Sequence, residues 1–306
     1  MSYIFLTIFI VFLVCGAYIH FRGKVRFKLQ RQITDHSIFL SPLNCLFFLF
    51  SKHPNKPYVD VGHFKELDVL QENWQIIQEE AVKLYDSAKI KSSDRLDDVG
   101  FQSLFRTGWK RFYLKWYGKP LPSANSLCPN TVSILETIPN VRGGMFALLP
   151  PDGKLSGHRD PYAGSLRYHL GLVTPNSADC YIKVDGEKYF WKDGEAVIFD
   201  ETYIHSVENN TDVNRIILFL DIKRPVKFFF VSWLDKIFSH IFMSAAATKN
   251  IDGDKVGLIN KIFPAIYSTA RIGQKVKAYN RKLYYGLKYL VFALLFYFLI
   301  IHWIVF

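Results

Sequence analysis

The chain has 306 residues, half of them apolar, so it can bury a full core as one domain with additional membrane segments. Its formal net charge of +11 indicates an anionic partner. The basic residues gather beside the apolar termini, which favours anionic lipid as that partner. The sequence has no zinc-finger, basic-zipper or RNA-recognition signature, which excludes nucleic acid. Cys15, Cys45, Cys128 and Cys180 lack metal or disulfide-framework spacing, which excludes a disulfide scaffold and fits a reducing compartment.

The first predicted element is a transmembrane helix over residues 1–21. This stretch contains no Lys, Arg, Asp or Glu, and about 20 helical residues suffice to span a hydrocarbon layer. A cleaved signal peptide is the alternative, but no basic residue precedes the apolar run and no small-x-small cleavage site ends it. The positive-inside rule places the rest of the chain in the cytoplasm, because basic residues follow directly: Arg22, Lys24, Arg26, Lys28 and Arg31.

A second transmembrane helix is predicted over residues 289–306, which carry no formal charge. Several Lys and Arg residues precede it, so the same rule again places the intervening region in the cytoplasm. Residues 38–50 and 228–243 are shorter apolar stretches that predict interfacial helices, with buried core helices as the alternative. The predicted divisions are two anchors (1–21 and 289–306), a basic and interfacial segment (22–63), a central domain (64–225) and an interfacial and basic helical segment (226–288).

The central domain opens with a predicted amphipathic helix. Between residues 65 and 86, apolar side chains recur at alternating spacings of three and four, which is typical of a helix packed on a core. Residues 109–117 interleave aromatic and basic side chains and predict a strand that either lines a basic groove or, more commonly for this pattern, has a solvated face. A short helix is predicted from Pro129 to about Thr137, since Pro139 follows.

From Gly144 onward the pattern becomes that of short β-strands. Apolar and polar residues alternate around Arg167 and His169, so these two side chains share one face of a strand, and Asp185-Gly186 predicts a tight hairpin. The expected strands are 166–170, 180–184, 188–191, 196–199 and 215–221. The prediction is an α+β fold built on a double-stranded β-helix of jelly-roll or cupin type, with flanking helices and a transmembrane helix at each terminus.

One set of residues in this β region has the chemistry of a metal site. His158-Arg159-Asp160 is followed 45 residues after Asp160 by His205 and ten residues later by Arg215. Two imidazoles and a carboxylate form the facial triad that holds Fe(II) with open coordination positions. A guanidinium matches a carboxylate bidentately, so Arg215 is a candidate to bind a dicarboxylate such as 2-oxoglutarate. An ordinary turn at Asp160-Pro161 is the alternative, because His-x-Asp is a short pattern.

Three blocks of sequence resemble the aspartyl/asparaginyl β-hydroxylase family. They are 157–161, 166–172, and 197–201 leading to His205, and the resemblance covers roughly residues 100–225. Within the family, the two apolar termini and the intact His-x-Asp make the chain most similar to the bacterial lipid A 2-hydroxylases. Peptide-hydroxylating members can lack the carboxylate ligand that Asp160 supplies here, which favours a lipid-type site.

The resemblance implies that residues 64–225 form an Fe(II)- and 2-oxoglutarate-dependent oxygenase domain. The implied Fe(II) ligands are His158, Asp160 and His205, and the implied 2-oxoglutarate contacts are Arg215 at the distal carboxylate with Arg167 and His169 near the iron-binding end. A plain surface charge is the alternative for Arg167, and a core histidine for His169. A hydroxyl that holds the cosubstrate in some relatives would fall near Ala147 here. Asp200 follows a predicted strand and is expected to be structural.

The function implied is hydroxylation of a secondary acyl chain of lipid A at C2, with O2 and 2-oxoglutarate as cosubstrates, on the cytoplasmic face of the bacterial inner membrane. The expected partners are lipid A or its acylated precursors and anionic inner-membrane lipids. One alternative is a membrane-anchored hydroxylase of Asp or Asn side chains, in which residues 109–115 would bind acidic peptides. Another is a non-enzymatic jelly-roll scaffold.

Overall fold

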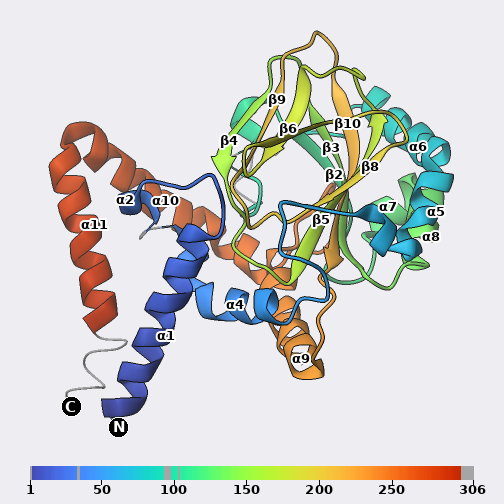
Figure 1. Cartoon of the computed structure of the whole chain (residues 1–306). Helices are drawn as coiled ribbons and strands as arrows, with labels where there is room; N and C mark the ends of the chain where they lie inside the picture. Colours follow the sequence, from blue (N-terminus) through green and yellow to red (C-terminus); the bar gives the residue numbers. More distant parts are fainter. Residues whose placement is uncertain (1, 33–34, 93–97, 103, 298–306) are drawn as a thin grey trace.

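The computed structural model describes residues 2–32, 35–92, 98–102 and 104–297 (Figure 1). Its strands form two antiparallel sheets, with orders β1-β8-β5-β10-β3-β2 and β4-β9-β6-β7. The strands are β1 (Tyr58–Val59), β2 (Lys110–Trp116), β3 (Val141–Leu149), β4 (Lys154–His158), β5 (Ser165–Val173), β6 (Cys180–Val184), β7 (Glu187–Phe190), β8 (Ala196–Phe199), β9 (His205–Asn209) and β10 (Arg215–Lys223).

The helices flank these sheets on the outside. The α-helices are α1 (Ser2–Phe21), α2 (Leu29–Gln32), α3 (His36–Phe39), α4 (Ser41–Leu49), α5 (Asp68–Glu72), α6 (Trp74–Asp86), α7 (Pro122–Leu127), α8 (Pro129–Glu136), α9 (Phe229–Phe238), α10 (Leu258–Tyr279) and α11 (Arg281–Phe296). The shorter helical turns are η1 (Val61–His63), η2 (Lys65–Leu67), η3 (Phe105–Thr107), the π-helical η4 (Ser239–Met243) and η5 (Ser244–Ala246).

The sheet arrangement confirms the predicted α+β jelly roll. The strands expected around Arg167 and His169 and at 180–184 and 196–199 lie at those positions as β5, β6 and β8. Asp185 and Gly186 both have positive φ (50° and 90°) and join β6 to β7 in a tight hairpin. The core lies between the sheets and under the helices at the right of Figure 1.

The predicted amphipathic helix packs on that core. It is divided at Asn73 into α5 and α6, and α6 buries Ile77, Ala81 and Leu84 on one face. Its Glu80 is buried too, because both carboxylate oxygens accept backbone N–H groups at the start of α8. The helix predicted from Pro129 to about Thr137 is α8.

The predicted solvated face for residues 109–117 is wrong. β2 is almost fully buried, because it pairs with β3 at the edge of the large sheet and is covered by aromatic side chains. Arg111 is only 2% exposed, and its Nε donates to Asp98, 2.9 Å away. A buried guanidinium is tolerated there because a buried carboxylate neutralises it.

Within the part of the chain that the structure describes, no helix has both the length and the apolarity to cross a membrane. The predicted transmembrane anchors are therefore not supported. Near its end, α1 packs against protein: Ile19 is 2% exposed and contributes to a small second core. The predicted anchor at 289–306 is described only as the end of α11, and residues 298–306 lie outside the described residues.

The two segments predicted as interfacial have both a buried and an exposed face. In α4, Phe47 and Phe48 are buried while Leu49 is 70% exposed, and in α9 Val231 is buried while Phe229 is 85% exposed. The buried faces meet in the second core with Ile19 and with the loop that follows β4. The buried faces agree with the core-helix alternative, and the interfacial role stays a prediction for the exposed faces.

Candidate metal and cosubstrate site

The smaller sheet brings the predicted metal ligands together. His158 ends β4 and pairs across the sheet with His205, which begins β9, and Asp160 follows two residues after His158. One potential ligand atom from each of the three residues lies within 4.8 Å of the other two. We call His158, Asp160 and His205 the metal triad. Two imidazoles and one carboxylate this close together are the set of side chains that binds Fe(II) in a facial triad.

Both histidines of the metal triad are oriented by backbone carbonyls. The Nδ1 of His158 lies 2.8 Å from the carbonyl oxygen of Ser156, and the Nδ1 of His205 lies 3.0 Å from that of Tyr203. Because a carbonyl only accepts, each Nδ1 carries the proton, and the Nε2 lone pair remains for a metal. Burial and the nearby His158 lower the pKa of His205 to about 3, so its imidazole is neutral at neutral pH.

Arg167 holds the carboxylate of the metal triad. Its Nη2 lies 2.8 Å from Asp160, and the same guanidinium forms ion pairs with Glu201 and Asp221. Burial favours a protonated Asp160, but the charge of Arg167 holds its pKa well below the ordinary value, so the carboxylate is ionised and ready to bind a cation. Arg167 is 6% exposed, so it is not a plain surface charge.

Sequence reasoning did not identify Glu201 and Asp221 as part of this network. Burial raises the pKa of both carboxyl groups. The backbone of Glu201 also fixes the position of Asp160, because the Glu201 carbonyl accepts the N–H of Asp160 at 2.9 Å. The signal in the sequence was weak: both residues follow or end apolar strands, where an acidic side chain needs a partner.

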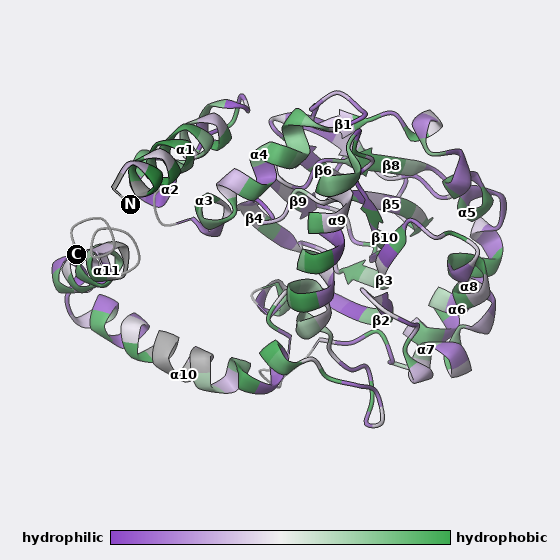
Figure 2. Ribbon diagram, turned by 90° about the horizontal axis from the view of Figure 1, so that it is seen from below, coloured by the Kyte–Doolittle hydropathy of each residue, from purple (hydrophilic) through white to green (hydrophobic). Residues whose placement is uncertain are grey.

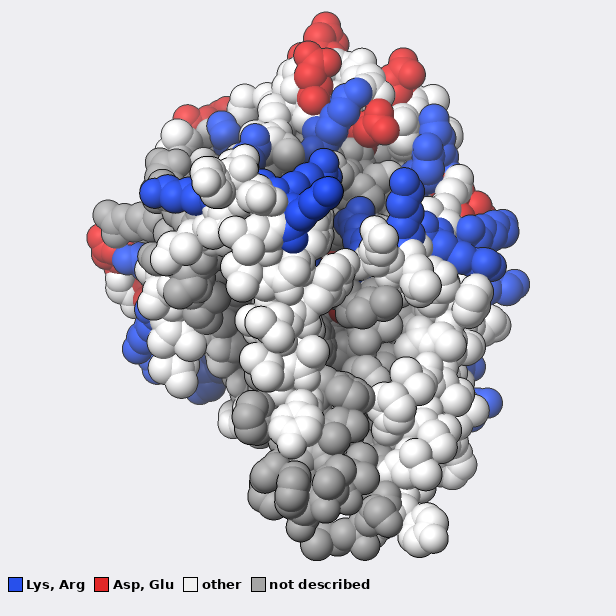
Figure 3. All heavy atoms as spheres, turned by 90° about the vertical axis from the view of Figure 1, so that its left-hand side faces the viewer, with Lys and Arg blue, Asp and Glu red and all other residues white. Residues whose placement is uncertain are grey.

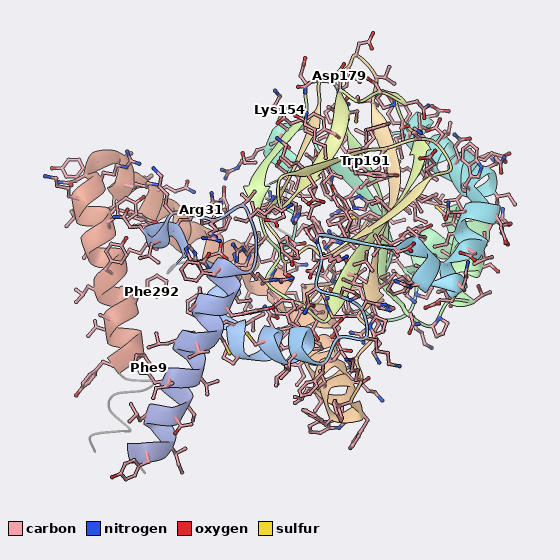
Figure 4. All side chains as sticks on the ribbon, in the orientation of Figure 1. Phe9, Arg31, Lys154, Asp179, Trp191 and Phe292 are labelled. Atoms are coloured by element: carbon pink, nitrogen blue, oxygen red, sulfur yellow. The ribbon has the colours of Figure 1, made fainter. Side chains whose placement is uncertain are left out.

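Arg215 faces the same cavity from the start of β10, in the larger sheet. It is 2% exposed, and its guanidinium carbon lies 4.5 Å from the centroid of Trp191, which Figure 4 labels. Burial lowers its pKa to about 10. Among the described residues no carboxylate forms a salt bridge with Arg215, and its Nε has no hydrogen-bond partner. A buried cation without a counter-ion fits a site that receives a carboxylate ligand.

His169 lies close enough to both Arg167 and Arg215 to feel their charges. Its side chain shares a face of β5 with Arg167, and its ring lies 5.1 Å from that of Phe219. Burial and the neighbouring Arg215 lower its pKa well below the ordinary value, and neither ring nitrogen has a partner within the described chain. Ala147 lines the same cavity, so it offers no hydroxyl at that position.

A cavity of about 730 Å³ connects these groups. The metal triad, Arg167, His169 and Arg215 all line it. Its remaining wall is largely apolar and includes Phe101, Leu104, Trp109, Trp116, Met243 and Ala246. The space exceeds what a small dicarboxylate needs, so it also suits part of an apolar substrate.

The N-terminal helices contact the loops that carry the metal triad. Asn44 of α4 donates from Nδ2 to the carbonyl of Pro161 at 2.8 Å and accepts the N–H of Ala163 at 2.9 Å. Arg22, just after α1, forms a 2.8 Å ion pair with Asp200, which also pairs with Arg224. The structural role predicted for Asp200 is confirmed. The contacts of Asn44 and Arg22 were not foreseen, since no local pattern links residues more than 100 positions apart.

Replacing Asn44 with Ala is expected to weaken metal binding. The change leaves the part-buried carbonyl of Pro161 and the buried N–H of Ala163 unpaired, at a cost of about 2 kcal/mol, and loosens the loop that follows Asp160. Loss of such outer-shell support typically costs about 10- to 100-fold in metal affinity. Urea unfolding and anaerobic Fe(II) titration measure the two effects, with Ser126→Ala on the exposed side of α7 as control. If the Asn44→Ala protein is less stable but binds Fe(II) as tightly as the wild type, Asn44 does not support metal binding.

Known proteins provide a comparison for this geometry. The sequence model of the aspartyl/asparaginyl beta-hydroxylase family matches residues 71–225. An ornithine lipid ester-linked acyl 2-hydroxylase of Rhizobium tropici is 35% identical over 189 residues, which cover 60% of this chain and 67% of that protein. The human aspartyl/asparaginyl beta-hydroxylase is 27% identical over 174 residues, 54% of this chain but only 22% of the human protein.

Among solved structures, a prolyl-4-hydroxylase of Pseudomonas putida aligns with 51% of this chain and 88% of its own. The sequence identity is 14% and the TM-score is 0.34. The jelly-roll assignment therefore rests on the strand order of this chain itself.

Proposed function

The chain belongs to the aspartyl/asparaginyl beta-hydroxylase family, and from this premise we propose that it is an Fe(II)- and 2-oxoglutarate-dependent dioxygenase that hydroxylates C2 of a lipid-linked acyl chain. The observation that carries the proposal is one cavity lined by both the metal triad and Arg215, a buried guanidinium without a carboxylate partner among the described residues. The similarity to a lipid acyl 2-hydroxylase supports the choice of substrate.

The chain's own residues would perform distinct tasks in this reaction. His158 and His205 offer Nε2, and Asp160 offers a carboxylate oxygen, to Fe(II). Arg215 would neutralise the distal carboxylate of 2-oxoglutarate, and Arg167 and His169 would lie near the end that binds the metal. Fe(II), when bound with 2-oxoglutarate and O2, supplies the oxidant that converts an unactivated C–H bond to C–OH. Arg167 positions Asp160 by its 2.8 Å ion pair.

The apolar part of the cavity wall suits an acyl chain. Phe101, Trp109 and Trp116 line the same cavity as the metal triad, and Met243 is a flexible side chain in the same wall. These side chains bury the methylene groups of the substrate and exclude water from the metal, which protects a reactive centre from side reactions.

We propose lipid A, or an acylated precursor of it, as the substrate, with a secondary acyl chain as the group that is hydroxylated. The second candidate is an ornithine lipid, because the Rhizobium tropici relative is named for that substrate. Both present an acyl chain beside a polar headgroup. A peptidyl Asp or Asn residue is the third candidate, favoured by the similarity to the human protein, but the apolar wall suits it less.

The protein would act at a membrane surface, on the cytoplasmic face of the bacterial inner membrane. Figure 2 shows apolar residues along α1, α4 and α9 on the side seen from below. Phe229 and Trp233 of α9 are 85% and 58% exposed, and the exposed Lys227 and Lys236 flank them. Exposed aromatic rings beside lysines are typical of helices that rest in the interface of anionic membranes. η4 and η5 continue from α9 to Met243 and Ala246 in the cavity wall.

The direct test is turnover by the purified chain with Fe(II), 2-oxoglutarate and O2. Separate reactions contain lipid A, an ornithine lipid, or an Asp- and Asn-containing peptide. We expect succinate to form in equal amount to a lipid product that carries one added oxygen atom. Tandem mass spectrometry should place this oxygen at C2 of an acyl chain. Oxygen added only to the peptide, or succinate without any oxidised lipid, would reject lipid hydroxylation.

A further inference from the structure

The cavity rim beside the metal triad carries a second cationic feature that the reaction so far does not use. Arg31, from α2, and Arg159, between two residues of the metal triad, both line the cavity, as does His36 of α3. The carboxylates in the described part of that lining are Asp160, Glu201 and Asp221, and all three form ion pairs with Arg167. Negative charge is therefore gathered around Arg167, while Arg31 and Arg159 supply positive charge at the rim.

These two arginines contact the same aromatic ring. The guanidinium carbon of Arg31 lies 3.8 Å from the ring centroid of Phe27, and that of Arg159 lies 5.0 Å from the same ring. Arg31 donates from Nη2 to the carbonyl of Gly157 at 3.0 Å, directly before His158. Arg159 donates from Nη1 to the carbonyl of Ile19 at 3.2 Å, and its buried Nε has no partner in the described chain.

Arg159 is strongly desolvated. The residue is only 3% exposed. His36 helps to fix the backbone of Arg159, because its Nε2 donates to the carbonyl of Arg159 at 2.9 Å. Two guanidinium groups with restricted orientation favour an oxyanion such as phosphate or carboxylate. Figure 3, which views the side where α1 and α11 project, shows Lys and Arg gathered on the upper part of that face.

The chemistry of C2 hydroxylation explains why a headgroup contact belongs here. C2 is the first carbon beyond the acyl carbonyl, and in a secondary acyl chain the ester and the first three carbons of the primary acyl chain separate it from the polar headgroup. When C2 is next to the metal triad, this short linker keeps the headgroup in the neighbourhood of the ligands, at the cavity rim. Arg31 contacts the residue next to His158, at the required place.

We propose that Arg31 and Arg159 form an anion-binding site for the headgroup of the lipid substrate, a phosphate or a carboxylate, and that this site sets which carbon of the acyl chain reaches the metal. The inference rests on the proposed function. Binding of the anion at the rim leaves the acyl chain to extend along the apolar wall formed in part by Trp116 and Met243.

The test compares Arg31→Ala with Arg26→Ala. Arg26 is an exposed arginine of the same segment that does not line the described cavity, so it controls for the loss of one charge. Binding of detergent-solubilised lipid A and of an ornithine lipid to metal-free protein is measured first, and turnover with Fe(II) and 2-oxoglutarate second. We expect Arg31→Ala to weaken binding and raise KM by roughly 10- to 100-fold, as for loss of a charged hydrogen bond.

Arg31→Lys should recover part of the affinity, and Fe(II) with 2-oxoglutarate should bind to Arg31→Ala as to the wild type. Weakened binding of lipid A alone identifies phosphate as the anion, weakened binding of the ornithine lipid alone identifies carboxylate, and either supports the site. Equal binding by Arg31→Ala and Arg26→Ala overturns it. If the wild-type chain binds these lipids but oxidises none, the proposed reaction fails while the binding comparison still decides the headgroup site.

Discussion

Replacing His158 or Asp160 with Ala is expected to reduce lipid hydroxylation by more than 100-fold. Each change removes one of three ligands, and loss of an outer-shell partner alone already costs about 10- to 100-fold in affinity or activity. His158 and Asp160 are partly exposed at the cavity, so the folded state should persist. The measurement is the initial rate of oxidised lipid formation together with Fe(II) bound per chain.

The matched control for this prediction is His63→Ala. His63 is exposed in η1 and does not line the described cavity, so both activity and bound iron should equal those of the wild type. A His158→Ala protein that keeps full activity, or that loses activity while still binding one Fe(II) with wild-type affinity, would contradict the role of the metal triad.

Replacing Arg215 with Met is expected to raise the KM for 2-oxoglutarate by at least about 30-fold, since truncating one partner of a buried charge pair costs roughly 2 kcal/mol or more. The same change should leave the free energy of unfolding in the absence of cosubstrate unchanged or higher. The reason is that Arg215 is 2% exposed and makes no salt bridge with the residues described, so its burial is costly until a carboxylate binds.

Two measurements check that Arg215→Met binds 2-oxoglutarate more weakly without becoming less stable. Steady-state kinetics give the KM for 2-oxoglutarate, and thermal unfolding with and without 2-oxoglutarate, in the presence of Fe(II) under anaerobic conditions, gives the stabilisation by the ligand. Arg106→Met, at an exposed position outside the described cavity lining, should behave as the wild type in both. An unchanged KM in Arg215→Met would place the dicarboxylate elsewhere.

The β region could be predicted closely because its signals are local. The Asp185-Gly186 turn, the alternation in β5 and the apolar run of β8 each determine structure within a few residues. The spacing of His158, Asp160 and His205 also indicated that they form one metal site. In the structure, one potential ligand atom from each of the three lies within 4.8 Å of the other two.

Other features depend on contacts between distant parts of the chain and left little local trace. The burial of Arg111 requires Asp98, and the pairing of Arg22 with Asp200 joins residues separated by almost the whole central domain. The roles of α4 and α9 were left open between interface and core, because one apolar helix face looks like another until its partner is known. Ile19 shows the same effect at the end of α1, where apolar sequence packs against protein.

The most direct test of the metal and cosubstrate site is anaerobic titration of the purified chain with Fe(II) and 2-oxoglutarate, followed by visible absorption. Chelation of the metal by 2-oxoglutarate in the site should produce a charge-transfer band that saturates at one Fe(II) per chain, is absent in His158→Ala, and needs far more 2-oxoglutarate in Arg215→Met. A wild-type chain that binds no Fe(II), or that shows no such band at saturating 2-oxoglutarate, would contradict the account and favour a non-enzymatic jelly-roll scaffold.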